Sequence, residues 1–168
     1  MVCGCGLLCG NQAIAQTQLR GQRRVDGVER LKLFKHRWSR IQSQYLEYDK
    51  TWGFAVRDAA GIRHGFLEFV GGHSELIYRQ LLIVGEFVRR LRALLDWFEC
   101  QDQLEFISSS LLLVYNGNDD PLLAPQVQLK IIDFAHVRRG AFIDSGYIEG
   151  LRKVISLLED ITHAKLIM

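Results

Sequence analysis

The sequence lacks the marks of a secreted or membrane-spanning protein. Of its four cysteines, three (Cys3, Cys5 and Cys9) lie at the very start, in a spacing that matches no familiar zinc or iron–sulfur motif. They imply no disulfide framework, so a reducing cytosolic or nuclear setting is expected. The faintly apolar start has no positively charged region ahead of it, which argues against a signal peptide. No run of about 18 apolar residues occurs, so no membrane span is expected.

Proline and net charge are also in short supply. The chain has two prolines, and no repeat, low-complexity tract or obvious linker interrupts its 168 residues. Hydrophobic residues make up 48%, enough to bury a real core. One domain over residues 1–168 is therefore expected, with residues 1–16 unassigned. A formal net charge of only +2 gives little support to nucleic-acid binding.

Basic residues are nevertheless concentrated in one early segment. Apolar residues recur at intervals of three and four from Val28 to Tyr45, which predicts a helix with the basic residues mostly off its apolar side. Such a patch suits a phosphate-rich ligand, and a solvated helix face is the open alternative. The aromatic residues share the apolar side, which favours core packing over stacking on bases. The cluster comprises Arg20, Arg23, Arg24, Arg30, Lys32, Lys35, Arg37 and Arg40.

The remaining patterns predict an α+β fold, an antiparallel sheet with packed helices. Ser74 is the expected N-cap of a long helix that runs to about Cys100, a residue expected to be a small buried hydrophobe. The last two predicted strands are joined by a loop, and they are expected to pair as an antiparallel hairpin. The expected strands are Trp52–Val56, Phe66–Val70, Phe106–Tyr115 and Val127–Phe134, and a last helix covers Tyr147–Ile161.

Three motifs in the second half carry a family resemblance. They are SSSLLLVYNG at Ser108–Gly117, KIIDFAH at Lys130–His136 and DSGYIEGL at Asp144–Leu151. In this order they resemble the SSSLL, IDFAH and DxGYIFGL signatures of the inositol polyphosphate kinase family, with Glu149 in place of the usual Phe. The resemblance runs from about Trp52 to Glu159, and it implies the fold of that family's carboxy-terminal lobe.

The resemblance also implies a site. Asp133 would hold a Mg²⁺ ion that bridges the phosphates of ATP, because a carboxylate at the end of an apolar strand is rigidly placed. His136 would contact an inositol phosphate, and Lys130 would have a supporting role. A strand-terminating cap at Asp133 and a surface histidine without a role are the open alternatives. By the same resemblance, three serines lie beside the catalytic cleft and support it: Ser108, Ser109 and Ser110. Ordinary strand-end hydrogen bonding is the open alternative for them.

One family signature, PxxxDxKxG, is poorly matched. Its counterpart is the segment from Thr17 to Arg23, in which Gly21 alone matches securely. Thr17 stands where the family has Asp, and Leu19 stands where it has Lys. A shift of one residue puts Arg20 in the Lys position, where its planar guanidinium can neutralise phosphate charge but does not replace a compact ammonium. The family's ATP-gripping amino-terminal lobe also finds no counterpart.

Two functions follow as hypotheses. The first is an ATP-dependent inositol phosphate kinase, or part of one, in which Arg20, Arg23, Lys35 and Arg40 bind substrate phosphates. A fragment, a faulty gene model and a degenerate paralogue stay open, and no turnover by this chain alone is expected. The second is a non-catalytic module on the same fold that binds inositol phosphates or a partner protein. Nucleic-acid binding is disfavoured.

Overall fold

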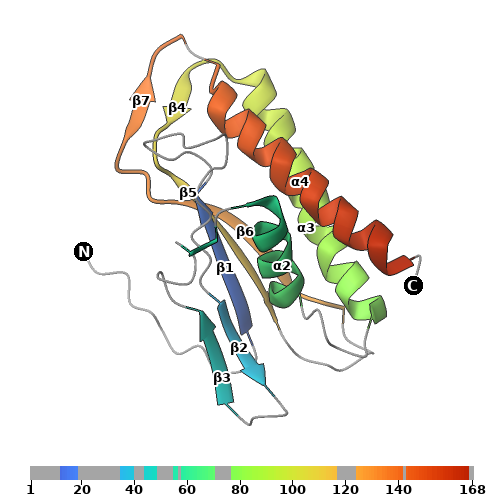
Figure 1. Cartoon of the computed structure of the whole chain (residues 1–168). Helices are drawn as coiled ribbons and strands as arrows, with labels where there is room; N and C mark the ends of the chain where they lie inside the picture. Colours follow the sequence, from blue (N-terminus) through green and yellow to red (C-terminus); the bar gives the residue numbers. More distant parts are fainter. Residues whose placement is uncertain are drawn as a thin grey trace.

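The computed structural model describes residues 12–18, 35–39, 44–48, 55–56, 58–70, 77–116, 124–141 and 143–166. Figure 1 shows a twisted sheet flanked by helices, with a small second sheet beyond one of its ends. Residues 12–18, 35–39 and 44–48 form strands, of which only the backbone is described.

The main sheet has five strands in the order β3-β2-β1-β5-β6, and every neighbouring pair is antiparallel. The expected hairpin is confirmed, because β5 and β6 pair from Ser110↔Ile132 to Tyr115↔Val127. A second sheet joins β4 to β7. The strands are β1 (Gln12–Gln18), β2 (Lys35–Ser39), β3 (Gln44–Tyr48), β4 (Leu104–Phe106), β5 (Ser110–Asn116), β6 (Val127–Ile132) and β7 (Val137–Arg139).

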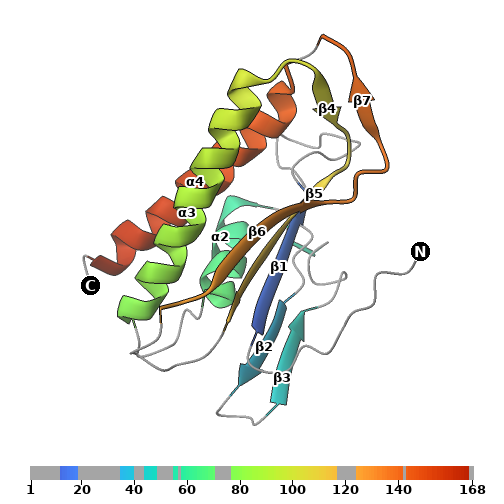
Figure 2. The ribbon, with the colours of Figure 1, turned by 180° about the vertical axis from the view of Figure 1, so that it is seen from behind.

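Three helices lie on one side of the main sheet: α2 (Ala59–Phe69), α3 (Ile77–Cys100) and α4 (Ser145–Leu166). The two long helices pack side by side, and the short α2 lies between α4 and the sheet (Figures 1 and 2). None of the described helices is long and apolar enough to cross a membrane.

The core forms where the helices meet β5. Because side chains alternate along a strand, Leu111, Leu113 and Tyr115 all point to the helix side, where they are buried. The Tyr115 ring meets Phe69 edge-on at 5.2 Å between centroids, and its hydroxyl donates to the Phe69 carbonyl at 2.6 Å. The tyrosine of the SSSLL motif therefore ties β5 to the last turn of α2.

Two expected elements are wrong in type. Where the structure describes the helix expected at Val28–Tyr45, it shows instead the antiparallel strands β2 and β3, with Trp38 opposite Tyr45. Trp38 and Tyr45 are two helical turns apart in the sequence, a spacing that two facing strand residues also produce. Conversely, the strand expected at Phe66–Val70 is the end of α2, which starts after Asp58, whose side chain accepts from the Gly61 N–H at 2.7 Å.

Other boundaries also differ from expectation. Of the expected strand Trp52–Val56, residues 52–54 lie outside the described part of the chain, and Ala55 is helical. Ser74, the expected N-cap of α3, also lies outside it. Part of the unassigned start forms β1, in the middle of the sheet. Cys100 is exposed rather than buried, since it ends α3. The strand expected at Phe106–Tyr115 is broken in two, and this break shapes the candidate site.

Candidate functional site

The break in the strand is a bulge between two hairpin ladders. The pair Phe106↔Val137 ends one ladder and Ser110↔Ile132 begins the next. Three residues (107–109) therefore lie opposite four (133–136), so the strand that carries the IDFAH motif has one extra residue. A bulge of this kind bends its strand and redirects side chains, and bulges are frequent next to active sites.

Two residues of the bulge have left-handed backbones although neither is glycine. Ser108 has φ 58° and Asp133 has φ 65°. Such a conformation costs an L-residue about 1–2 kcal/mol. Across the bulge, the Ser109 hydroxyl donates to the Asp133 carbonyl at 3.1 Å, and the Ile107 N–H donates to the His136 carbonyl at 3.2 Å. A neutral hydrogen bond contributes about 0.5–1.5 kcal/mol, which is comparable to the strain at one residue.

Asp133 lies on the exposed side of this bulge. All residues from Asp133 to His136 are exposed, and the Phe134 ring is 56% exposed although one edge contacts Phe106. Beneath them, Ser109 is fully buried. The Asp133 carboxylate is thus not enclosed in the core. Enclosure there would have excluded a metal role.

The donor set suits only one kind of metal site. No group of three or more His, Cys, Asp or Glu residues comes together within the described segments, so these offer no cage for zinc or calcium. Mg²⁺ and its analogues are commonly held by one or two carboxylates together with phosphates and water. The exposed Asp133 carboxylate at the end of a strand fits a metal that arrives with a nucleotide.

One other predicted residue lies on the way to this end of the sheet. The end of β1 at Gln18 is opposite the start of β5 at Ser110, which in turn is opposite the end of β6 at Ile132. β2 runs antiparallel to β1, and its first residue, Lys35, lies opposite Ala15, about 10 Å short of that end. Strands lie about 4.8 Å apart, so β2 is roughly 14 Å from β6. Phosphate binding by this basic segment stays a prediction. Six of its members lie outside the described residues: Arg20, Arg23, Arg24, Arg30, Lys32 and Arg40.

Lys130 lies on the face of the main sheet opposite the helices. It pairs with Leu112, and side-chain alternation puts both on the opposite face from Leu111 and Leu113. Lys130 is exposed, whereas Leu112 is half-buried. Figure 2 shows that no described helix covers this face beside β1 and β6.

The third motif forms a buried clamp, a role that the sequence did not reveal. Asp144 is 2% exposed, and its carboxylate accepts from the Phe106 N–H at 2.7 Å and from the Tyr147 N–H at 3.1 Å. It thereby caps α4 and holds β4 next to it. The Tyr147 ring stacks on Phe98 at 4.3 Å, and burial, with Asp144 nearby, raises the pKa of the Tyr147 hydroxyl well above its usual range. Glu149, the departure from the family pattern, is exposed on α4.

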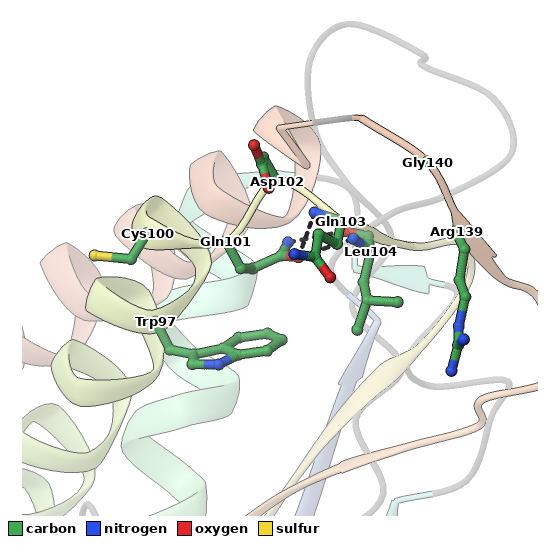
Figure 3. Close-up of a pocket in the computed structure, with 8 residues that line it drawn as sticks. All are labelled: Trp97, Cys100, Gln101, Asp102, Gln103, Leu104, Arg139 and Gly140. Atoms are coloured by element: carbon green, nitrogen blue, oxygen red, sulfur yellow. Dashed lines mark hydrogen bonds between the residues drawn. The ribbon is translucent and has the colours of Figure 1, made fainter.

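A surface pocket of about 660 Å³ lies apart from Asp133, between the end of α3 and the small sheet. Figure 3 shows the Trp97, Leu104 and Arg139 side chains along it. The Gln101 side chain closes the turn above it, donating to the Leu104 carbonyl at 2.8 Å and accepting from the Leu104 N–H at 2.9 Å. Its lining does not include Asp133.

Comparisons with known sequences point to one family. The family model for inositol polyphosphate kinase matches residues 24–159. Inositol hexakisphosphate kinase 3 of Homo sapiens is 31% identical over 151 residues, covering 72% of this chain and 36% of the relative. Inositol polyphosphate multikinase beta of Arabidopsis thaliana is 40% identical over 84 residues, covering 45% of this chain and 27% of the relative. The chain thus matches about a third of the length of these curated relatives.

Solved structures agree on the fold. An inositol phosphate multikinase structure superposes with a TM-score of 0.71 at 21% identity, covering 90% of this chain and 79% of that one. The multikinase of S. cerevisiae, solved with ADP and Mn²⁺, gives 0.64 at 16% identity, covering 90% and 78%. The predicted α+β fold is confirmed. Because the family model matches most of the sequence, from the basic segment through all three motifs, this chain belongs to the inositol polyphosphate kinase family.

Proposed function

We propose that this chain supplies the metal-binding lobe of an ATP-dependent inositol phosphate kinase, with Asp133 as the ligand of a divalent ion, Mg²⁺ in the cell. The observation that carries the proposal is the exposed Asp133 carboxylate, set on a left-handed backbone at a bulge where β6 ends. The ADP and Mn²⁺ in the related yeast structure support the same ligand chemistry.

The residues around the bulge have distinct parts in this proposal. Asp133 would hold a divalent ion that arrives with ATP, and this ion would supply positive charge against the negative charge that develops during phosphoryl transfer. Asp133 offers it an oxygen, and the hydrogen bonds from Ser109 and Ile107 hold the segment that carries that oxygen. His136 lies three residues further along the exposed segment, where it is proposed to meet a substrate phosphate. Further phosphate contacts are assigned to Arg20, Arg23, Lys35 and Arg40, and Lys130 keeps a supporting role.

A second function, binding of inositol phosphates without turnover, is favoured by one observation. Thr17 pairs with Leu111 and Gln18 with Ser110, so the first two residues of the poorly matched segment lie beside the bulge. Thr17 and Leu19 then occupy the positions where the family has a carboxylate and an ammonium. Without that carboxylate, no group is assigned to orient the hydroxyl that attacks the phosphate.

Metal binding tests the proposal directly. Free Mn²⁺ is titrated into the protein with ADP and followed by its paramagnetic resonance signal. Asp133→Asn should weaken Mn²⁺ binding at least about tenfold, because the charged oxygen is lost. Asp160→Asn, which removes an exposed carboxylate from α4, should leave it unchanged. Equal Mn²⁺ affinity in wild type and Asp133→Asn would show that Asp133 is not the ligand.

Inositol hexakisphosphate separates the two functions. A binding module should bind it equally well with and without ATP and Mg²⁺, and should transfer no phosphate. Transfer of labelled phosphate from ATP to an inositol polyphosphate, lost in Asp133→Asn, would establish the kinase and dismiss the binding-only function.

A further inference from the structure

We infer that Ser109 is a positioning residue, whose buried hydroxyl fixes the backbone of Asp133 and so sets the direction of the carboxylate. The inference rests on the proposed metal-binding function of Asp133. It adds a reason for the backbone conformation that presents this exposed carboxylate, and it gives one member of the SSSLL motif a physical task.

The bulge is where the ordinary strand ladder gives way. Up to the Ser110↔Ile132 pair, regular pairing with β5 holds the backbone of β6. Regular pairing resumes only at Val137, opposite Phe106. Within this gap the Asp133 carbonyl accepts from the Ser109 side chain instead of from a ladder N–H. A side-chain hydroxyl thus takes over a backbone task at the residue before the exposed segment.

The direction of the Asp133 side chain depends on that bond. At φ 65° the Cβ atom projects differently from the alternating pattern of the strand before it. An extended backbone would relieve the strain and would swing the carboxylate elsewhere. The Ser109 hydroxyl opposes this relaxation, because a change in the Asp133 backbone would pull its carbonyl away from the donor.

Ser109 is well suited to the task because it cannot easily move. It is fully buried, so its side chain has little room to change rotamer and water does not compete for its hydrogen bond. The neighbouring Ser110 is almost as buried, at 2% exposed, but its hydroxyl makes no hydrogen bond to Asp133 in the described part of the chain. Adjacent serines of the same size and burial therefore differ in this one interaction, which makes a matched pair of variants.

The experiment compares Ser109→Ala with Ser110→Ala. Each variant, as the full chain, is titrated with Mn²⁺ in the presence of ADP, and its unfolding midpoint is measured in urea. Ser109→Ala should weaken Mn²⁺ binding about 3- to 10-fold, the equivalent of one hydrogen bond. Ser110→Ala should stay within about twofold of wild type, since it removes no contact with Asp133. Should Ser109→Ala not fold, Ser109→Cys, which keeps the side-chain shape but is slightly larger and a weaker donor, is compared in its place.

A double-variant cycle separates positioning from general loosening of the fold. In the Asp133→Asn background, Ser109→Ala should cause no further loss of Mn²⁺ affinity, because its effect passes through the Asp133 carboxylate. Equal losses from Ser109→Ala and Ser110→Ala, or full additivity with Asp133→Asn, would overturn the inference. If Asp133→Asn itself binds Mn²⁺ like wild type, the proposed metal site fails, and that outcome is distinct from a failure of Ser109 alone.

Discussion

Replacing Asp144 with alanine should be among the most destabilising single changes in this protein. The carboxylate is 2% exposed and accepts two backbone N–H groups, at 2.7 Å from Phe106 and at 3.1 Å from Tyr147. One bond joins β4 to the start of α4, and the other caps α4. Alanine would leave both donors without this acceptor in a buried setting.

The expected cost follows from these two bonds. Hydrogen bonds to a charged group contribute about 1.5–3 kcal/mol, and loss of an N-cap alone costs about 0.5–2 kcal/mol. Because the two overlap at the Tyr147 N–H, we expect Asp144→Ala to lower the free energy of unfolding by about 3–5 kcal/mol. That is a large part of the roughly 5–15 kcal/mol available to a typical domain. Asp144→Asn keeps the shape and one acceptor oxygen, so it should cost about half as much.

Urea denaturation followed by far-ultraviolet circular dichroism measures both variants, with Asp58→Ala as the control. Asp58 also caps a helix, accepting from the Gly61 N–H at 2.7 Å, but it is exposed and holds no second element. Its loss should cost only about 1 kcal/mol. If Asp144→Ala costs no more than Asp58→Ala, the buried clamp adds nothing beyond an ordinary cap and the reasoning fails.

Three further predictions concern two buried tyrosine hydroxyls and one surface glutamate. Tyr147→Phe should leave stability unchanged or raise it by up to about 1 kcal/mol in urea denaturation, because the buried Tyr147 hydroxyl has no hydrogen-bond partner among the described residues. Tyr115→Phe should cost about 1 kcal/mol in the same assay, since its hydroxyl donates to the Phe69 carbonyl; identical effects of the two changes would contradict both. Hydrogen bonds from Arg89 and then Arg90 outweigh partial desolvation and lower the pKa of Glu86 from 4.5 to about 2. The stability that Glu86→Gln removes, no more than about 1 kcal/mol for a surface pair, should therefore be present above pH 4.5 and vanish as the pH falls to about 2. A difference in unfolding free energy that does not change over this range would refute it.

The sequence predicted the second half of the fold well because its signals are local. A long apolar stripe marked α3, and strong β-forming runs on either side of a loop marked the β5–β6 hairpin. The first half offered misleading local signals. Phe66–Val70 has the composition of a strand, yet Phe66 and Phe69 are three residues apart and are both buried on one side of α2. The pairing of Trp38 with Tyr45 produced a helix-like spacing across a hairpin.

The sequence indicates a candidate residue for the site but not the geometry around it. The IDFAH motif pointed to Asp133, and the structure shows it exposed at a strand end. The bulge could not be foreseen, because a register offset depends on how two strands pair and leaves no mark in either one alone. Ser108 and Asp133 have left-handed backbones, but neither is glycine, so the sequence does not indicate this conformation. Asp144 was missed as a clamp because its partners are backbone N–H groups, which every sequence has.

The central place of β1 has a consequence for how the protein folds. Thr17 pairs with Leu111, although most of the described chain lies between them in sequence. The β5–β6 hairpin and the packed α3 and α4 are built from segments closer in sequence, so they can form with less loss of loop entropy. Closing β1 against β5 is a long-range step, and it alone connects the β2–β3 hairpin to the β5–β6 hairpin. β1 is synthesised before β5, so β1 cannot join the sheet until its partner has emerged. The end of the sheet that bears Asp133 is therefore completed late in folding.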